Sequence, residues 1–324
     1  EAKVSDDLKI GARLATGTST DNAATVAEST STNQTFNSFF VKFPINLDLA
    51  YLEYSPEAPG VSNVTLVGGI MENPLWTVGG MVWDPDLSWD GAAVKLSNTL
   101  EPVTLFTNNG LFFLDTDETE AAVLWVTQAG VTVSPFATSE QEALKNLKVT
   151  GALAYHDYVN VTSAAKAGTD PITRISSNTS SVRDFNQLNP SVEIATQVAG
   201  YPVSMFTDVV HNIAAGSGSG NDGFMIGAKI GKAKSSFFSP SGLDFKHGWE
   251  AGYFFERLEE NAAFDEFVDS DFGGGGTNRR GNVFWLTLAT LKNSTFGTKV
   301  YAAKQLTGVR GGEDRIQLDW VTKF

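Results

Sequence analysis

Apolar and polar residues alternate along many short segments of this chain, and this period of two most constrains its fold. In the segment LKIGARLAT, which begins at Leu8, the apolar side chains fall on one face. Lys9 and Arg13 fall on the opposite face. A period of two places successive side chains on opposite sides of a β-strand. The sequence therefore predicts an all-β fold whose strands have one apolar and one polar face.

Fourteen such strands follow a short stub at Glu1–Val4. They cover residues 8–16, 45–55, 63–72, 91–98, 103–114, 121–134, 147–160, 191–200, 202–212, 223–232, 244–258, 282–292, 296–306 and 314–324. Two segments, Val103–Leu114 and Val283–Leu291, are apolar on both faces, so the pattern assigns no inner face to them. We treat both as candidate contacts between subunits.

The connections between the expected strands alternate between short and long. Long polar connections include Gly17–Phe40, Asn73–Asp90 and Glu259–Arg279, whereas the connections between them are mostly tight turns. One short-side connection, residues 138–145, is predicted to contain a short periplasmic helix, because Ser139 and Glu142 have the spacing of a capping box. Long loops at one end and tight turns at the other are typical of an antiparallel transmembrane β-barrel.

Composition narrows the function further. The 324 residues contain no cysteine and only three histidines, which excludes disulfide scaffolds and thiolate metal sites. The formal net charge of −14 argues against nucleic acid as a partner. A helix that spans a membrane needs about 18 consecutive apolar residues, and the sequence has no such run. A transmembrane barrel remains possible, because its strands are short and only alternately apolar.

The carboxy-terminal segment DRIQLDWVTKF, residues 314–324, gives the sharpest signal. Ile316, Leu318, Trp320 and Phe324 share one face, and the chain ends on the aromatic residue. A terminal phenylalanine that closes an alternating strand is what the outer-membrane assembly machinery reads in bacterial barrels. We therefore interpret these four residues as an outer-membrane assembly signal.

Four segments resemble the Putative porin family of Gram-negative bacteria. They are EAKVSDDLKIGARLATG (1–17), PINLDLAYLEYSP (44–56), GGIMENPLWTVGGMVWDPD (68–86) and FVDSDFGGGGTN (267–278). The resemblance implies a non-enzymatic outer-membrane porin, a passive diffusion channel for small hydrophilic solutes and ions. It also implies contact with the lipid bilayer and lipopolysaccharide, and a homotrimer, the common state of barrels of this size.

The strand count and the resemblance together indicate a single barrel domain, residues 1–324, that is larger than the chain. The stub and fourteen strands make fifteen, whereas bacterial single-chain barrels have even numbers. We therefore expect a sixteen-stranded barrel whose first strand and most of the second are absent from this chain. These strands were either cleaved, supplied by a separate N-terminal fragment, or never sequenced.

In a sixteen-strand numbering the segment 73–90 is the third external loop, which in general porins folds into the lumen. The expected constriction residues are Glu72, Trp76, Asp84, Asp86 and Asp90. Basic residues on inferred lumen faces would oppose them and set a field across the pore, and charge rings of this kind tune ion selectivity. They are Lys9, Arg13, Lys95, Lys148, Lys246 and Arg315. The alternative is that this loop covers the barrel mouth or contacts a neighbouring subunit.

No cofactor or metal is expected, and calcium is only a weak candidate. Asp84, Asp86, Ser88 and Asp90 have the alternating oxygen spacing of a calcium loop, but the bidentate glutamate that completes such a loop is missing.

Two other classes of function remain open from the sequence. One is a structural or assembly barrel of an envelope complex without conduction. The other is a soluble secreted β-rich binding protein.

Overall fold

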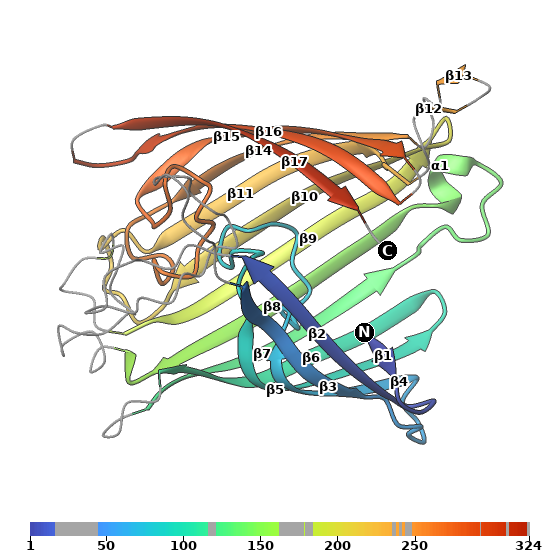
Figure 1. Cartoon of the computed structure of the whole chain (residues 1–324), viewed down its shortest axis with the longest axis horizontal. Helices are drawn as coiled ribbons and strands as arrows, with labels where there is room; N and C mark the ends of the chain where they lie inside the picture. Colours follow the sequence, from blue (N-terminus) through green and yellow to red (C-terminus); the bar gives the residue numbers. More distant parts are fainter. Residues whose placement is uncertain are drawn as a thin grey trace.

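The computed structural model describes residues 1–16, 45–115, 121–161, 178, 184–234, 238–239, 242–243, 248–291, 293–308 and 311–322. Its main element is a fifteen-stranded antiparallel sheet in which neighbouring strands follow one another along the chain. The strands are β1 (Ala2–Lys3), β2 (Leu8–Thr16), β3 (Ile45–Tyr54), β4 (Asn63–Met71), β5 (Trp89–Leu100), β6 (Val103–Asp115), β7 (Ala122–Val133), β8 (Lys148–Val159), β9 (Asn186–Val198), β10 (Tyr201–Asn212), β11 (Asp222–Gly231), β14 (Trp249–Leu258), β15 (Arg279–Leu291), β16 (Ser294–Gln305) and β17 (Gly312–Thr322). Figure 1 shows the sheet curving from β3–β5 through β8 and β9 to β14–β17.

The predicted all-β fold is confirmed, and the stub and the fourteen expected strands all correspond to strands of this sheet. In the part of the chain that the structure describes, β1 and β17 stand at the two edges of the sheet. The sixteen-stranded closed barrel therefore stays a prediction.

One connection on the short-turn side differs from expectation. The strand expected at residues 244–258 is described as β14 from Trp249 onward, and residues 244–247 lie outside the described residues. The segment before it contains a separate hairpin of β12 (Phe238–Ser239) and β13 (Gly242–Leu243). The chain thus projects a small second sheet at this end of the molecule (Figure 1).

The helix α1 (Glu142–Lys145) is a single turn within the expected range 138–145. The expected capping box is wrong: the N-cap is Gln141, and it makes no side-chain cap bond. Ser139 Oγ instead accepts the N–H of Gln141 at 3.2 Å. Among the described residues, no helix is long and apolar enough to cross a membrane.

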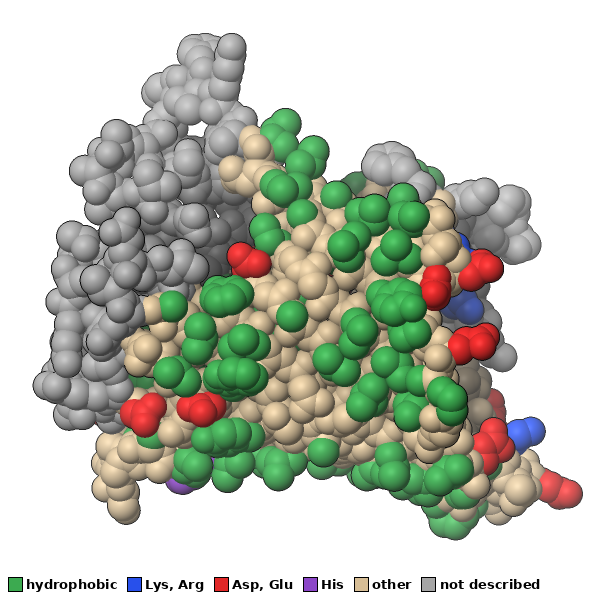
Figure 2. Space-filling model, turned by 90° about the horizontal axis from the view of Figure 1, so that it is seen from below, with side chains coloured by type: hydrophobic (Ala, Val, Ile, Leu, Met, Phe, Trp, Pro, Cys, Tyr) green, Lys and Arg blue, Asp and Glu red, His purple; other side chains and the backbone are tan. Residues whose placement is uncertain are grey.

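The convex face of the sheet is apolar and exposed. In β17, Ile316, Leu318 and Trp320 are 71%, 64% and 59% exposed and alternate with the more buried Arg315 and Gln317. Other exposed apolar side chains on this face belong to strands around the whole sheet: Leu66, Val94, Leu105, Phe113, Trp125, Leu153, Met205, Phe224, Phe284 and Leu286. Figure 2 shows such side chains covering the strands, with acidic side chains toward both ends.

The hydrophobic core lies on the concave side, where side chains of the strands pack against two long connections. We call these connections loop A, residues 72–88, and loop B, residues 259–278. Loop A contributes Met81, Val82 and Trp83 to the core, and loop B contributes Phe264 and Val268. Both connections therefore fold inward against the wall of the sheet.

Candidate pore constriction

Loop A is fixed to the sheet by the side chain of Gln128 on β7. The Gln128 Nε2 donates to the Trp76 carbonyl, and its Oε1 accepts the Trp76 N–H, both at 2.9 Å. Asn108 on β6 donates to the same Oε1 at 2.8 Å and so fixes the orientation of the amide. These bonds satisfy a buried polar side chain and hold Trp76 against the inner wall.

A second contact fixes the middle of loop A. The indole Nε1 of Trp83 donates to Nε2 of His156 on β8, 3.2 Å away, and both side chains are buried. The Trp83 ring also packs 4.4 Å from the ring of Trp89, measured between centroids. The tryptophans that the sequence placed in this connection thus pack inward.

Asp84 joins loop A to loop B. Its backbone N–H donates to the Phe267 carbonyl at 2.7 Å. Its carboxylate accepts the N–H of Asp86 at 2.9 Å and the N–H of Ser270 at 2.8 Å. The side chain is 4% exposed, and burial raises its pKa above the ordinary value. Asp84 is therefore a clamp between the two loops.

Loop B turns back on itself through four glycines. Gly273–Gly276 all have positive φ angles, between 62° and 82°, a conformation that side chains with a Cβ rarely adopt. Just before this turn, Asp269 is half-buried beside Asp84 and Asp271. Burial raises the Asp269 pKa to about 7, and repulsion by these two carboxylates adds to the shift, while the Asp271 N–H and Lys299 oppose it.

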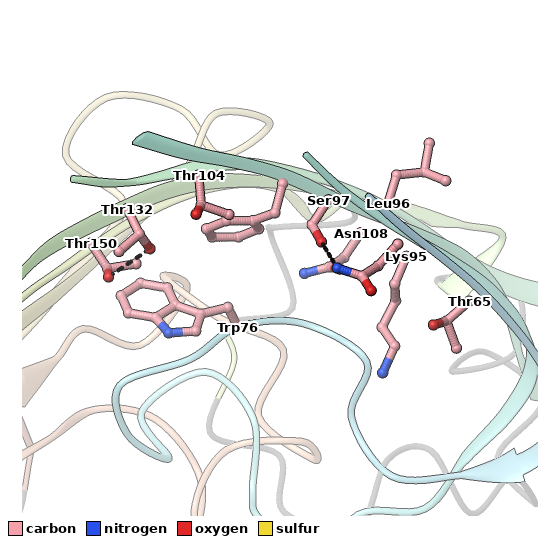
Figure 3. A pocket seen from close by; sticks show the side chains of 11 residues that line it. Thr65, Trp76, Lys95, Leu96, Ser97, Thr104, Asn108, Thr132 and Thr150 are labelled. Carbon is pink, nitrogen blue, oxygen red and sulfur yellow. Dashed lines mark hydrogen bonds between the residues drawn. The ribbon is translucent and has the colours of Figure 1, made fainter. Parts of the chain in front are cut away.

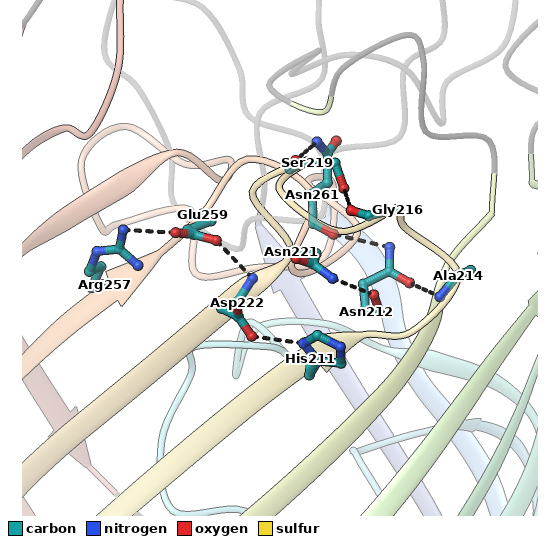
Figure 4. Close-up of polar contacts among 10 residues, drawn as sticks. All are labelled: His211, Asn212, Ala214, Gly216, Ser219, Asn221, Asp222, Arg257, Glu259 and Asn261. Atoms are coloured by element: carbon teal, nitrogen blue, oxygen red, sulfur yellow. Dashed lines mark hydrogen bonds and ion pairs between the residues drawn. The ribbon is translucent and has the colours of Figure 1, made fainter.

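Arg315 reaches loop B from the inner face of β17. Its guanidinium lies 2.5 Å from a carboxylate oxygen of Asp271 and 2.8 Å from one of Glu313. The base of loop B is further held by asparagines: Asn212 Nδ2 donates to the Asn261 carbonyl at 3.0 Å (Figure 4). The Asn261 N–H donates to the Gly220 carbonyl at 2.7 Å. Loop B is thus tied to the wall on two sides.

Beside loop A the concave side keeps a cavity of about 450 Å³. Its lining is mainly hydroxyl and amide side chains of β4–β8, together with Trp76 and Lys95 (Figure 3). Thr132 and Thr150 hydrogen-bond to each other at 2.9 Å, and Asn63 donates to Ser97 at 3.2 Å. Lys95 extends from β5 into this space. Polar side chains therefore make up most of the cavity wall, and Lys95 adds one positive charge to it.

The structure places the other expected basic residues as follows. Lys9 pairs with Glu53 of the neighbouring strand at 2.7 Å. Arg13 pairs with Asp48 and, at 3.1 Å, with Glu72 at the start of loop A. Lys148 is exposed at the α1 end of β8, in step with the inward-facing Thr150. Lys246 lies outside the described residues.

The expected acidic residues do not form one group. Asp84 is buried in the clamp, Glu72 pairs with Arg13, and Asp86 donates its N–H to Asp84. Asp90 is exposed on β5 next to the buried Trp89, so strand alternation turns it to the convex face. The structure therefore separates Asp90 from the loop carboxylates.

The structure contradicts the weak calcium candidate at Asp84, Asp86 and Asp90. Ser88 Oγ donates to Asp48 at 2.9 Å, Asp84 is occupied by backbone N–H groups, and Asp90 faces the other side of the sheet. Within the described part of the chain, no group of three histidine or carboxylate side chains could hold a metal ion.

Comparison with known proteins identifies the family of the chain. Residues 1–194 and 184–324 match the model of the family described as Putative porin. The chain belongs to this porin family. A crystal structure of the outer membrane channel DcaP of Acinetobacter baumannii is similar, with a TM-score of 0.46 and 11% identity, covering 98% of this chain and 80% of that one. No curated protein sequence matches the chain.

Sequence reasoning did not predict the contacts by which Gln128 and His156 hold loop A of this porin-family chain. Gln128 and His156 are fully buried inner-face residues, although both lie at polar positions of their strands. The sequence signal for Gln128 and His156 is a polar residue in the middle of a strand, on the face predicted to be concave. Phe324 of the expected assembly signal lies outside the described residues, whereas Ile316, Leu318 and Trp320 share the convex face.

Proposed function

We propose that the chain is an outer-membrane porin, a passive diffusion channel for small hydrophilic solutes and ions. The observation that carries this proposal is the division of the sheet into a convex apolar face and a concave face with a hydroxyl- and amide-lined cavity. Lipid cannot satisfy backbone polar groups, so a sheet crosses a membrane only as a closed barrel. At about sixteen strands such a barrel leaves an aqueous lumen.

Loops A and B together form the constriction in this proposal. Loop A alone was expected to narrow the pore, but its Asp84 clamp to loop B supports a constriction built from both. The open route then follows the wall of β4–β8 past Trp76 and Lys95, where solutes contact hydroxyl and amide groups. No covalent chemistry is required of any residue along it.

Planar-bilayer recording of the purified protein tests the proposal. We expect stepwise ion conductance, and we expect Lys95→Glu to shift the reversal potential in a salt gradient toward cation selectivity. Lys232→Glu, a matched charge reversal in the connection after β11, should leave the reversal potential unchanged. Protein that inserts without conductance would favour a structural barrel instead. The homotrimer stays a prediction that the same preparation can test by its mass in detergent.

A further inference from the structure

We propose that the convex face of β14–β17, at the end where the long loops lie, binds the phosphate of a membrane lipid headgroup. A cavity of about 530 Å³ opens there, with Arg280, Asn282, Lys304 and Asp314 among its lining residues. The inference rests on the proposed function in one respect, namely that this face contacts lipid.

Strand register sets the two cations side by side. Arg280 on β15 is the direct partner of Lys304 on β16. Arg280 is in step with the exposed Phe284, and Lys304 is in step with the exposed Val300, so both point to the convex face. Directly paired residues have Cβ atoms about 5 Å apart, and like charges at that spacing destabilise a sheet. An anion bound between Arg280 and Lys304 would attract both side chains and so offset their mutual repulsion.

The third cation in this row is already neutralised. Arg257 on β14 pairs with Arg280 in register, but its guanidinium lies 2.8 Å from a carboxylate oxygen of Glu259. Across the ranges that the structure describes, neither Arg280 nor Lys304 forms an ion pair. Arg280 and Lys304 therefore carry two adjacent positive charges that no described salt bridge neutralises.

Arg280 also has a donor that needs an acceptor. Its Nε atom is buried and has no hydrogen-bond partner in the protein. A buried N–H without an acceptor costs free energy, whereas a guanidinium donates two parallel hydrogen bonds to a phosphate. The site is open enough for such a group, because Gly281, Ala302 and Gly312 also line it.

The surroundings favour a lipid over a free anion. Phe284 and Leu286, 53% and 46% exposed, continue the same face of β15 toward its middle and would contact acyl chains. Tyr253 lies beside the site and donates its hydroxyl to Asn282 at 2.9 Å. Tyrosine is enriched where a membrane meets water, with its ring among lipid and its hydroxyl toward the headgroups. A phosphorylated headgroup at Arg280 would thus have its chains along an apolar surface.

Asp314 allows a second test, in which a substitution should strengthen lipid binding instead of weakening it. Its register partner is Ala302, so its carboxylate lines the cavity one step away from Lys304 on the same face. This negative charge opposes an anionic ligand. Removing it should strengthen binding, whereas removing either cation should weaken it.

The experiment is a titration of the detergent-solubilised full chain with lipid A, followed by native mass spectrometry. We expect Arg280→Gln and Lys304→Gln each to weaken binding by about tenfold, the value of one charge-assisted hydrogen bond. Asp314→Asn should strengthen binding, and Lys232→Gln, the same charge change outside the site, should match wild type. Dephosphorylated lipid A should bind at least about tenfold more weakly than lipid A.

Three outcomes would overturn the proposal. They are wild-type affinity in the Arg280→Gln/Lys304→Gln double variant, equal binding of the dephosphorylated lipid, and displacement of lipid A by inorganic phosphate at equal affinity. The last would indicate a site for soluble anions. Heat-modifiable gel migration checks that each variant is folded. Bilayer recording of the same samples separates the two proposals, because loss of lipid binding with normal conductance leaves the channel intact.

Discussion

Asp84 connects two loops that are far apart in the sequence, since its hydrogen bond to Ser270 spans 186 residues. We predict that Asp84→Ala releases loop A from loop B, because the partly buried N–H groups of Asp86 and Ser270 lose a charged acceptor worth roughly 2–3 kcal/mol. Hydrogen exchange at the Ser270 amide should become faster, and single-channel conductance should rise. Glu140→Ala, an exposed acid in the connection that contains α1, is the control. Unchanged exchange at Ser270 would show that other contacts hold the loops together.

Asp269 should make the constriction sensitive to pH. Its pKa is raised to about 7, so the packed loop holds a proton that the released loop loses near pH 4. Between about pH 4 and pH 7 the packed loop therefore binds more protons than the released loop. The stability of the packed loop is greatest below about pH 4 and falls as the pH rises to 7. Conductance should increase between pH 5 and about pH 8, and Asp269→Asn should remove most of this increase. Asp6→Asn, at an exposed position, should keep it.

At the scale of elements, strands could be predicted more closely than the loops that cross the lumen. The expected strand 191–200 begins five residues early, at Asn186, because its first residues look like a loop. Gln187 and Asn189 are polar, yet they are buried on the concave face, and Pro190, the residue after Asn189, pairs with Leu153. A polar interior removes the apolar signal by which a strand end is normally recognised.

The loops were less predictable because their partners are distant. The sequence shows residues 259–279 only as a long polar connection, and the contacts of this segment with Asp84 and Arg315 reveal that it folds inward. Alternation correctly assigned Arg315 to the concave face, but it could not choose between the acids of loop A and Asp271 of loop B. The period of a strand predicts on which face of the sheet a side chain lies, but it does not predict which residue that side chain contacts.

If loop B is half of the constriction, shortening it should widen the pore. We predict that replacing residues 264–276 by two glycines increases single-channel conductance severalfold, because it removes Phe264 and Val268 from the packing against loop A. Removing residues 136–140, which are largely exposed in the connection before α1, should leave conductance unchanged. Equal conductance in both variants would assign the constriction to loop A alone.

For the whole molecule, the division between an apolar convex face and a polar concave face decides between a membrane channel and a soluble binding protein. Neighbouring residues in the middle of β15 test it directly. Leu286 is 46% exposed on the convex face, whereas alternation turns Thr287 inward. Arginine on the lipid face of a barrel costs about 2–4 kcal/mol at the bilayer midplane, whereas a solvent-exposed substitution usually changes stability by less than about 0.5 kcal/mol.

We therefore predict that Leu286→Arg lowers the free energy of unfolding from phospholipid vesicles by about 2–4 kcal/mol, whereas Thr287→Arg changes stability little and alters conductance. Urea titration of the vesicle-inserted protein measures the first effect, and bilayer recording measures the second. A soluble protein would tolerate Leu286→Arg, because the new side chain would be hydrated. Equal stability of the two variants would therefore remove the membrane from the proposed function, whatever the fold of the sheet.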